Sequence, residues 1–299
     1  MDKTLVVITG PTGIGKTALA IQFAQQLGTE IISADSRQFF KELNIGVARP
    51  NVAELNAVPH HFIAFLSIHQ NFSAGRFASE ARGLLAQLFL KNDVVVCAGG
   101  SGLYLDAFLN GFDELPHDED VRKMLINEWH QKGLQQLQSE LKEKDPFYFE
   151  KVDKENPHRI IRALEVIRIT NSPFSKLRKG EIDKVAARVV KLGLTAEREF
   201  IYDRINTRVD QMINEGLEEE ARGLISYKHL NALNTVGYKE FFDYFDGVWS
   251  REVAIEKIKQ HSRNYAKRQM TYWRRDSSIH SIDAQSKNLL EQAIEILNK

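Results

Sequence analysis

Near its N-terminus the chain reads Gly10-Pro-Thr-Gly-Ile-Gly-Lys16-Thr17, which matches the phosphate-loop pattern G-x-x-x-x-G-K-[ST] at every fixed position. A β-branched run, Leu5–Thr9, precedes the loop, and a helical pattern, Ala18–Leu27, follows it. In this context successive backbone N–H groups surround a phosphate, and the helix N-terminus adds partial positive charge. Lys16 supplies a point charge, and the Thr17 hydroxyl can hold Mg²⁺. The pattern predicts a site for two linked phosphates, but it does not identify the group that carries them.

Further short apolar runs indicate the rest of the sheet. They lie at Glu30–Ala34, Asp93–Ala98 and Val189–Thr195, and helical patterns separate the earlier runs. Near-continuous apolar strands that alternate with helices are typical of a parallel sheet covered on both faces. We therefore predict an α/β fold with a P-loop NTPase-like parallel sheet core, helices on both faces and a helical insertion domain.

The insertion is indicated by a change in composition. Asp113–Asp120 is rich in acids, and Val121–Lys191 then reads almost wholly as helix. From Glu197 onward the pattern is helical to the end of the chain. The expected domains are a catalytic core of residues 1–112 and 189–299, with basic C-terminal helices, and a helical insertion of residues 113–188.

The composition excludes several classes of protein. The 299 residues contain 40 Lys+Arg and 40 Asp+Glu, so binding to nucleic acid or to a membrane would need a local patch. The single cysteine, Cys97, excludes a disulfide scaffold and a zinc site built from cysteines. No stretch approaches the ~20 apolar residues of a membrane-spanning helix. We expect a cytoplasmic protein that does not bind membranes.

The strand ends leave the chemistry open. In nucleoside triphosphatases an Asp after an apolar strand usually holds Mg²⁺, but Val94–Ala98 runs into Gly99-Gly-Ser-Gly102 instead. Asp35 follows the second predicted strand, where ligands of parallel sheets bind, so it could be a general base or a Mg²⁺ ligand. It is equally consistent with a helix N-cap, with Gln38 completing a capping box.

Two basic segments are candidates for binding RNA. Lys257–Arg275 holds seven basic residues interleaved with aromatic ones and no acid, and His158–Arg162 places Arg159 and Arg162 on one helical face. Cations for phosphates and rings for stacked bases are typical of RNA contacts. The alternative for each segment is a solvated helix face whose aromatic residues belong to the core. His60-His61 lacks further ligands at metal spacing, which favours a turn or a core pair.

Taken together, these segments resemble the tRNA dimethylallyltransferase (isopentenyltransferase) family of the bacterial type. The resemblance is carried by an ordered set of segments: Gly10–Thr17, Asp35–Gln38, Pro59–His61, Gly99–Tyr104, Asn156–Glu165, Arg204–Arg208, Gly216–Glu220, Gly237–Glu240 and Tyr265–Gln269. Two small departures occur, Ser101 where Thr is more common and Ser262-Arg263 where Thr-Arg is usual. The zinc finger of eukaryotic members cannot form with one cysteine.

The resemblance implies a reaction. A dimethylallyl group passes from dimethylallyl diphosphate to the exocyclic amine of the adenosine 3′-adjacent to the anticodon in tRNA, and diphosphate is released. By resemblance Asp35 takes the proton from the attacking amine, while Thr12 and Arg208 hold the diphosphate and orient the reaction. Mg²⁺ held at Thr17, together with Lys16, would stabilise the charge on the departing diphosphate. The implied diphosphate-binding residues are Gly10, Pro11, Thr12, Gly13, Ile14, Gly15, Lys16 and Thr17.

The resemblance also implies the partners. The insertion would clasp the anticodon stem-loop of a tRNA, the basic tail would line the channel, and the protein would be a monomer. The implied tRNA-binding residues are Asp35, Ser36, Arg37, Gln38, Ser101, Arg122, Lys123, Arg159, Ile160, Ile161, Arg162, Ala163, Arg263, Lys267 and Arg268.

Three other functions fit parts of the sequence. A free-adenylate isopentenyltransferase would share the phosphate loop but would use a small acceptor. A P-loop small-molecule kinase would use Asp35 to deprotonate an acceptor hydroxyl and would consume ATP. An RNA-binding protein with a structural nucleotide would bind RNA tightly and turn over neither donor.

Overall fold

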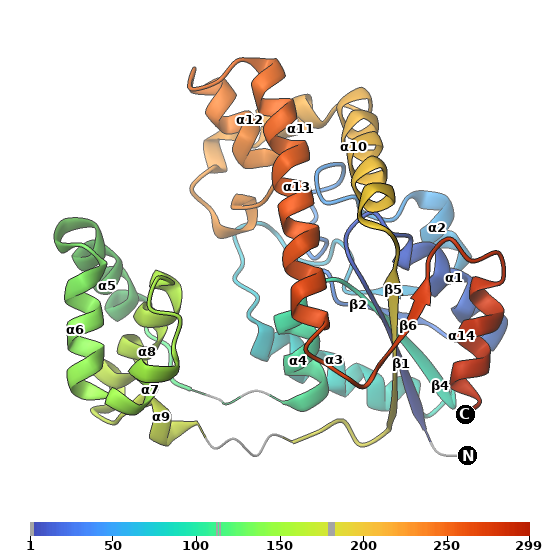
Figure 1. Ribbon diagram of the computed structural model, residues 1–299, viewed down its shortest axis with the longest axis horizontal. Coiled ribbons are helices and arrows are strands. Elements are labelled where there is room, and N and C mark those ends of the chain that lie inside the picture. The colour runs from blue at the N-terminus through green and yellow to red at the C-terminus, as the bar shows by residue number, and fades with distance from the viewer. Residues whose placement is uncertain (1–2, 112, 114, 179–182) are drawn as a thin grey trace. The chain divides into compact units, whose positions relative to one another are not determined.

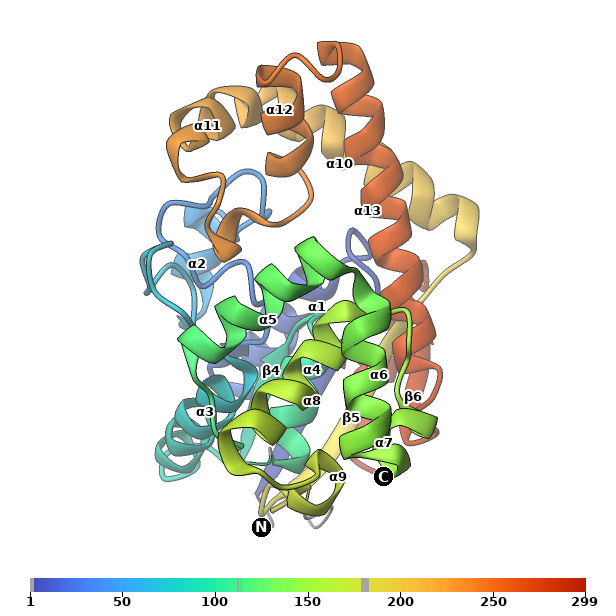
Figure 2. The same ribbon diagram turned by 90° about the vertical axis from the view of Figure 1, so that its left-hand side faces the viewer.

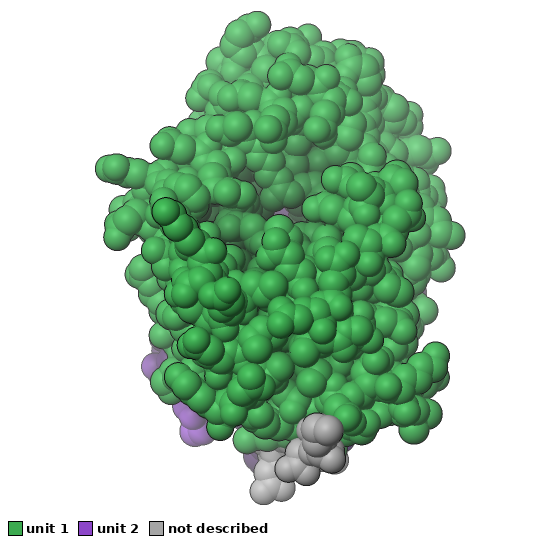
Figure 3. Space-filling model, turned by 90° about the vertical axis from the view of Figure 1, so that its right-hand side faces the viewer, with its two compact units in different colours: residues 1–110, 184–299 green, residues 111–183 purple. Residues whose placement is uncertain are grey.

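The structure is a computed structural model that describes residues 3–111, 113, 115–178 and 183–299. It divides into two compact units, residues 1–110 with 184–299 and residues 111–183, coloured separately in Figure 3. We call the first the α/β unit and the second the helical unit. The pattern of the sequence had placed these boundaries at 112/113 and 188/189.

The α/β unit is built on one parallel sheet. Within the described residues its strand order is β3-β2-β4-β1-β5-β6, and every neighbouring pair is parallel. All of β1 is buried, and it lies between β4 and β5 (Figure 1). The predicted α/β class with a P-loop-like parallel sheet is confirmed. The strands are β1 (Thr4–Thr9), β2 (Ile31–Ser33), β3 (His60–His61), β4 (Val94–Ala98), β5 (Arg188–Thr195) and β6 (Ile279–Asp283).

Helices cover both faces of this sheet. Alternate side chains of β1 point to opposite faces, so Leu5 and Val7 join the core beneath α3 and α4, whereas Val6 and Ile8 join the core beneath α1 and α14. Helices α10 to α12 lie beyond the carboxyl ends of the strands, and α13 runs from there down to α4 (Figure 1). The helices of this unit are α1 (Lys16–Leu27), α2 (Val52–Ala57), α3 (Ala74–Leu88), α4 (Gly102–Asn110), α10 (Arg198–Asn214), α11 (Leu217–Gly223), α12 (Tyr238–Phe245), α13 (Arg251–Trp273) and α14 (Leu289–Leu297), with 3-10 turns at Ile225–Tyr227 and Asn231–Leu233.

The helical unit packs around one central helix. Helix α8 contacts α5, α6 and α9 (Figure 2). Its residues Ile160, Ile161 and Leu164 are buried in a core of their own. The cap of α8 follows from sequence, because Asn156 accepts from the N–H of Arg159 and a proline occupies the first turn. The helices are α5 (Glu119–Lys132), α6 (Leu134–Lys144), α7 (Pro146–Lys151), α8 (Pro157–Thr170) and α9 (Phe174–Leu177).

Two strands were not predicted. The expectation that the chain is helical from Glu197 to its end is wrong at Ile279–Asp283, which forms the edge strand β6 beside β5. This strand has one neighbour in the sheet, and of its five residues only Ile282 is buried while His280, Ser281 and Asp283 are exposed, so the apolar signal is weak. Strand β3 is only two residues long. Among the described residues no helix combines the length and the apolar character needed for a membrane crossing.

Candidate active site at the carboxyl edge of the sheet

The phosphate loop connects β1 to α1 and is shaped by its glycines. Gly10 has a φ of 145°, and a Cβ there would lie 2.8 Å from the carbonyl oxygen of Leu194, so only glycine fits. The Nζ of Lys16 donates to the carbonyls of Gly10 at 3.0 Å and Pro11 at 2.9 Å. Burial lowers the pKa of Lys16 to about 8, although Asp35 acts in the opposite direction. The ammonium therefore lies over the loop, where a bound phosphate would meet it.

Two arginines of α10 reach the same loop. Arg204 donates from Nε to the carbonyl of Gly13 at 2.7 Å, and one helical turn later Nη1 of Arg208 lies 3.4 Å from Oγ1 of Thr12. Nη2 of Arg208 also points to the carbonyl of Ala48 at 3.5 Å. Burial lowers the pKa of Arg208, and Asp35 opposes that shift. Arg208 thus contacts Thr12 and lies close enough to Asp35 for the two charges to interact.

Asp35 follows β2 in a turn, not at the start of a helix. Its Oδ1 accepts from the backbone N–H of Arg37 at 3.1 Å, and turn residues continue to Phe39. Because no helix begins here, the N-cap and capping-box interpretations are wrong. Gln38 is buried and donates from Nε2 to the carbonyls of Val47 and Ala48, at 3.2 and 2.9 Å, which fixes the loop opposite. The carboxylate of Asp35 is left with no capping role.

Asp35 lines two cavities of the α/β unit. The larger, about 490 Å³, is lined by Thr12, Asp35 and Arg208, by apolar residues such as Val209 and Ile258, and by further polar residues. The smaller, about 40 Å³, lies on the phosphate-loop side and is lined by Lys16, Thr17, Asp35 and His60, among others. Asp35 therefore stands between the phosphate loop and the larger cavity.

The oxygen donors of the smaller cavity suit magnesium. Thr17 offers a hydroxyl to this cavity, and hard cations such as Mg²⁺ prefer oxygen ligands while keeping several waters. Within the described residues no group of three or more His, Cys, Asp or Glu side chains could hold a metal ion by itself. His60 is part of strand β3 and His61 pairs with Glu30 at 2.6 Å, so the histidine pair lies at a sheet edge.

The residues after Asp35 are tied to neighbouring loops. The backbone N–H of Ser36 donates to Oγ of Ser101 at 3.1 Å, and the two hydroxyls lie 3.2 Å apart. Nη1 of Arg37 donates to the carbonyls of Asn231 and Ala232, at 2.8 and 3.2 Å. Burial lowers the pKa of Arg37. These contacts join the Asp35 turn to the β4–α4 loop and to the segment before α12.

Helix α13 contains the basic segment predicted to bind RNA. Lys267 and Arg268 are exposed, and Arg268 also lines the larger cavity with Tyr265. Nη1 of Arg263 donates to Oδ1 of Asn206 at 2.6 Å. Burial, with Asp35 nearby, raises the pKa of Tyr265 to about 12. Trp273 packs against the core, so part of the aromatic content is structural, as the alternative interpretation held.

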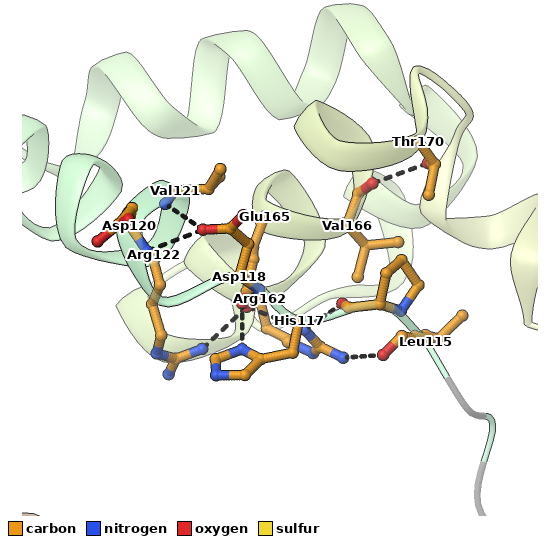
Figure 4. Close-up of polar contacts among 11 residues, drawn as sticks. Leu115, His117, Asp118, Asp120, Val121, Arg122, Arg162, Glu165, Val166 and Thr170 are labelled. Carbon is orange, nitrogen blue, oxygen red and sulfur yellow. Dashed lines mark hydrogen bonds and ion pairs between the residues drawn. The ribbon is translucent and has the colours of Figure 1, made fainter.

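In the helical unit the buried carboxylate of Glu165 accepts hydrogen bonds from two arginines (Figure 4). The Glu165 side chain is 0% exposed, and its Oε2 accepts from Nη1 of Arg122 at 3.1 Å and from Nη1 of Arg162 at 2.9 Å. Its Oε1 accepts from Nδ1 of His117 and from the backbone N–H of Asp118. Burial acts to raise the pKa of Glu165, but hydrogen bonds from Arg162 and His117 outweigh it and lower the pKa below its usual value.

The residues of this unit predicted to bind tRNA differ in how free they are. Lys123 and Arg159 are exposed, whereas Arg162 also donates to the carbonyls of Pro116 and Leu115, at 2.9 and 3.0 Å. The side chains of three further residues of this prediction are buried in the core of the unit, so their backbone is the part that remains for a contact, and the prediction for them stays untested. They are Ile160, Ile161 and Ala163.

Three polar residues that shape the site had no predicted role. Glu220 accepts from the backbone N–H groups of Ile45 and Gly46, at 2.9 and 3.0 Å, and from the hydroxyl of Tyr238 at 2.5 Å. Glu240, in the wall of the larger cavity, pairs with Nδ1 of His261 at 2.6 Å. Gln269, on α13, bonds to the phosphate loop. All three lie in segments that carried the family resemblance, which was the available signal.

Sequence comparisons find relatives over nearly the whole chain. The profile of a family described as IPP transferase matches residues 38–276. The chain is 47% identical over 277 residues to tRNA dimethylallyltransferase 1 of Bacteroides thetaiotaomicron, covering 92% of this chain and 90% of that one. It is 48% identical over 294 residues to tRNA dimethylallyltransferase of Christiangramia forsetii, covering 97% of each.

Solved structures share the fold. A tRNA isopentenylpyrophosphate transferase from Bacillus halodurans matches with a TM-score of 0.72 and 36% identity, covering 100% of this chain and 95% of that one. A eukaryotic dimethylallyltransferase acting on tRNA matches with a TM-score of 0.82 and 24% identity, covering 99% of this chain and 79% of that one. At the lower identity the likeness extends to the fold alone.

Proposed function

Because the chain belongs to the IPP transferase family, we propose that it transfers a dimethylallyl group from dimethylallyl diphosphate to the exocyclic amine of the adenosine 3′-adjacent to the anticodon in tRNA. The observation that carries this proposal is the position of Asp35, whose side chain lines both the cavity beside the phosphate loop and the larger cavity beyond it. A carboxylate in that place stands between a diphosphate held by the loop and a base entering the larger cavity.

Asp35 is the general base of the proposed reaction. The amine nitrogen attacks the allylic carbon, the bond from that carbon to the diphosphate oxygen breaks, and the amine proton passes to the Asp35 carboxylate. An adenine amine is a poor base that loses its proton only as the new bond forms. A positioned carboxylate therefore accelerates the step, by the ~10²–10⁴-fold typical of general bases.

The leaving diphosphate is stabilised by positive charge from two elements. Lys16 lies over the loop, and Arg208 reaches Thr12 from α10. Preorganised charges of this kind act where negative charge grows in the transition state. Thr17 would hold Mg²⁺, which supplies further neutralisation of the diphosphate when bound. No phosphoryl group is transferred, so the missing acid after β4 is explained.

The RNA is bound by exposed cations on both units. On the α/β unit Lys267 and Arg268 project from α13, and Arg268 also borders the larger cavity. On the helical unit Lys123 and Arg159 are exposed. The target adenosine must leave its stack to enter the larger cavity, as bases do in other modifying enzymes. The volume of about 490 Å³ is ample for one base and a five-carbon group.

One set of incubations tests the proposal. The protein, Mg²⁺ and dimethylallyl diphosphate are mixed with unmodified tRNA carrying adenosine at the last anticodon position, or with AMP, and the products are digested and weighed by mass spectrometry. We expect an adenosine heavier by one dimethylallyl group in the tRNA and little product with AMP. Product with AMP alone would instead indicate a free-adenylate enzyme. Release of ADP from ATP, with no prenylated product, would indicate a kinase.

A further inference from the structure

Gln269 holds the phosphate loop and the β4–α4 loop with a single side chain. It is buried on α13, with 5% of its surface exposed. Its Oε1 accepts from the backbone N–H of Thr12 at 2.9 Å, and its Nε2 donates to the carbonyl of Gly100 at 3.0 Å. The contact with Thr12 needs an acceptor and the contact with Gly100 needs a donor, so the oxygen and the nitrogen of the amide each have one possible place.

The site is built around that amide. A Cβ on Gly100 would lie 2.1 Å from Nε2 of Gln269, so a side chain at position 100 would force the amide away. Glutamate at 269 could still accept from Thr12, but its second oxygen would face the carbonyl of Gly100, and two acceptors repel. Alanine would leave the buried carbonyl of Gly100 and the half-buried N–H of Thr12 without this partner. The contact is therefore specific for Gln269 opposite a glycine.

Thr12 is fixed from two directions as a result. Its backbone N–H is committed to Gln269, while its Oγ1 faces Nη1 of Arg208. The N–H groups available to a diphosphate are then those later in the loop, and Thr12 can reach the donor only through its hydroxyl. A shift of Thr12 would move that hydroxyl away from Arg208.

We propose that Gln269 is a positioning residue that sets Thr12 for the diphosphate and ties the RNA-binding helix α13 to the phosphate loop; this inference rests on the proposed function. Arg268, the preceding residue, is exposed and borders the larger cavity, so one turn of α13 faces RNA on one side and the loop on the other. Loss of the amide weakens donor binding and transfer, and leaves the affinity for RNA unchanged.

The test breaks the contact from both ends. Gln269→Glu and Gly100→Ala are compared with two matched controls, Thr271→Ala on the exposed face of α13 and Gly83→Ala, where an added Cβ meets nothing within 4 Å. Binding of inorganic diphosphate with Mg²⁺ is measured by calorimetry, and binding of an anticodon stem-loop RNA by fluorescence anisotropy. We expect the two test variants to bind diphosphate about tenfold more weakly, as for one lost hydrogen bond, with unchanged RNA affinity and a higher KM for the donor.

The double variant Gln269→Glu/Gly100→Ala adds a second criterion. Both substitutions disrupt the same contact, so the double variant should lose no more diphosphate affinity than the more strongly affected single variant. Normal diphosphate affinity together with a lower melting temperature would overturn the proposal and leave a purely structural contact. An equal loss of RNA affinity would also overturn it. Because diphosphate binding is measured without turnover, an absence of prenyl transfer in the wild type would count against the proposed function and not against this contact.

Discussion

In the α/β unit Lys16, Asp35 and Arg208 come from three different elements and line cavities, whereas in the helical unit Arg122 and Arg162 converge on one buried carboxylate. The first arrangement leaves charge directed at space that a ligand can enter. The second uses charge to hold the protein together. Both regions contain clusters of charged residues in the sequence, so the difference shows that the presence of cations alone does not separate binding from structural roles.

A second cluster of the helical unit follows the structural pattern. Arg168 of α8 pairs with Glu128 of α5 at 2.8 Å and with Glu140 of α6 at 2.6 Å. The hydrogen bonds that Arg168 donates to both carboxylates raise the pKa of Arg168. These ion pairs join the three longest helices of the unit. Lys123 and Arg159, by contrast, are exposed.

Among changes to the α/β unit, distorting the phosphate loop should reduce diphosphate binding the most. In Gly10→Ala the new Cβ would lie 2.8 Å from the carbonyl of Leu194 at a φ of 145°, so the loop must distort. We expect diphosphate binding to fall by about 100-fold or more, in line with the loss of several charge-assisted hydrogen bonds. Calorimetry measures the affinity, and Gly83→Ala is the control. A loss of less than threefold would show that the loop is not the diphosphate site.

Removing Glu165 should give the largest effect in the helical unit. In Glu165→Ala two guanidinium groups lose their buried partner, and breaking such a cluster costs about 3 kcal/mol or more of the free energy of unfolding. Chemical denaturation followed by circular dichroism measures this loss. Diphosphate binding by the α/β unit should stay the same, and a parallel loss there would contradict the division of roles.

The acid sensitivity of the helical unit follows from the same carboxylate. The pKa of Glu165 is lower in the folded protein than in the unfolded chain, so its contribution to stability is full above the ordinary glutamate pKa. That contribution is lost as the pH falls through the lowered value. Glu165→Gln should remove this part of the acid destabilisation, measured as a flatter dependence of unfolding free energy on pH below 5. An unchanged slope would show that Glu165 does not carry it.

Substitutions of Arg122 and Arg162 should distinguish RNA binding from stabilisation of the fold within the Glu165 cluster. We expect Arg122→Ala to weaken binding of the anticodon stem-loop by about 1 kcal/mol and to reduce the salt slope by about one, as for one lost phosphate contact. Arg162→Ala should mainly lower the melting temperature, because its guanidinium also holds the carbonyls of Leu115 and Pro116. The opposite assignment of effects would show that Arg162 is the residue that contacts RNA.

Sequence reasoning worked where the signal is local. The buried strands β1, β4 and β5 are short apolar runs, and the phosphate loop has fixed spacing, so both were predicted. Strand β6 was not, because only Ile282 of its five residues is buried and the apolar run is therefore weak. The residues around Asp35 did not by themselves decide between a catalytic role and a helix N-cap. That choice depends on how the chain up to Ala48 folds back, and Ala48 has a φ of 48°.

The contacts that position the loops could not be predicted from the sequence for a different reason. Gln269 and Thr12 are 257 positions apart, and nothing in either local sequence shows that they meet. The same holds for Glu220 and the loop at Ile45. In the helical unit the helical period identified the face of α8 with Arg159 and Arg162, but the buried partner Glu165 appeared only in the folded structure.

The most direct test of the central claim is single-turnover prenyl transfer by Asp35→Asn. The enzyme in excess is mixed with dimethylallyl diphosphate and an anticodon stem-loop RNA, and the prenylated fragment is followed by mass spectrometry beside Asp246→Asn, an exposed carboxylate paired with Lys228. We predict that Asp35→Asn slows the chemical step by at least about 100-fold while diphosphate and RNA affinities stay within a factor of about two, since the amide keeps the shape and loses the base. A rate close to that of the control would contradict the assignment of Asp35 as the general base.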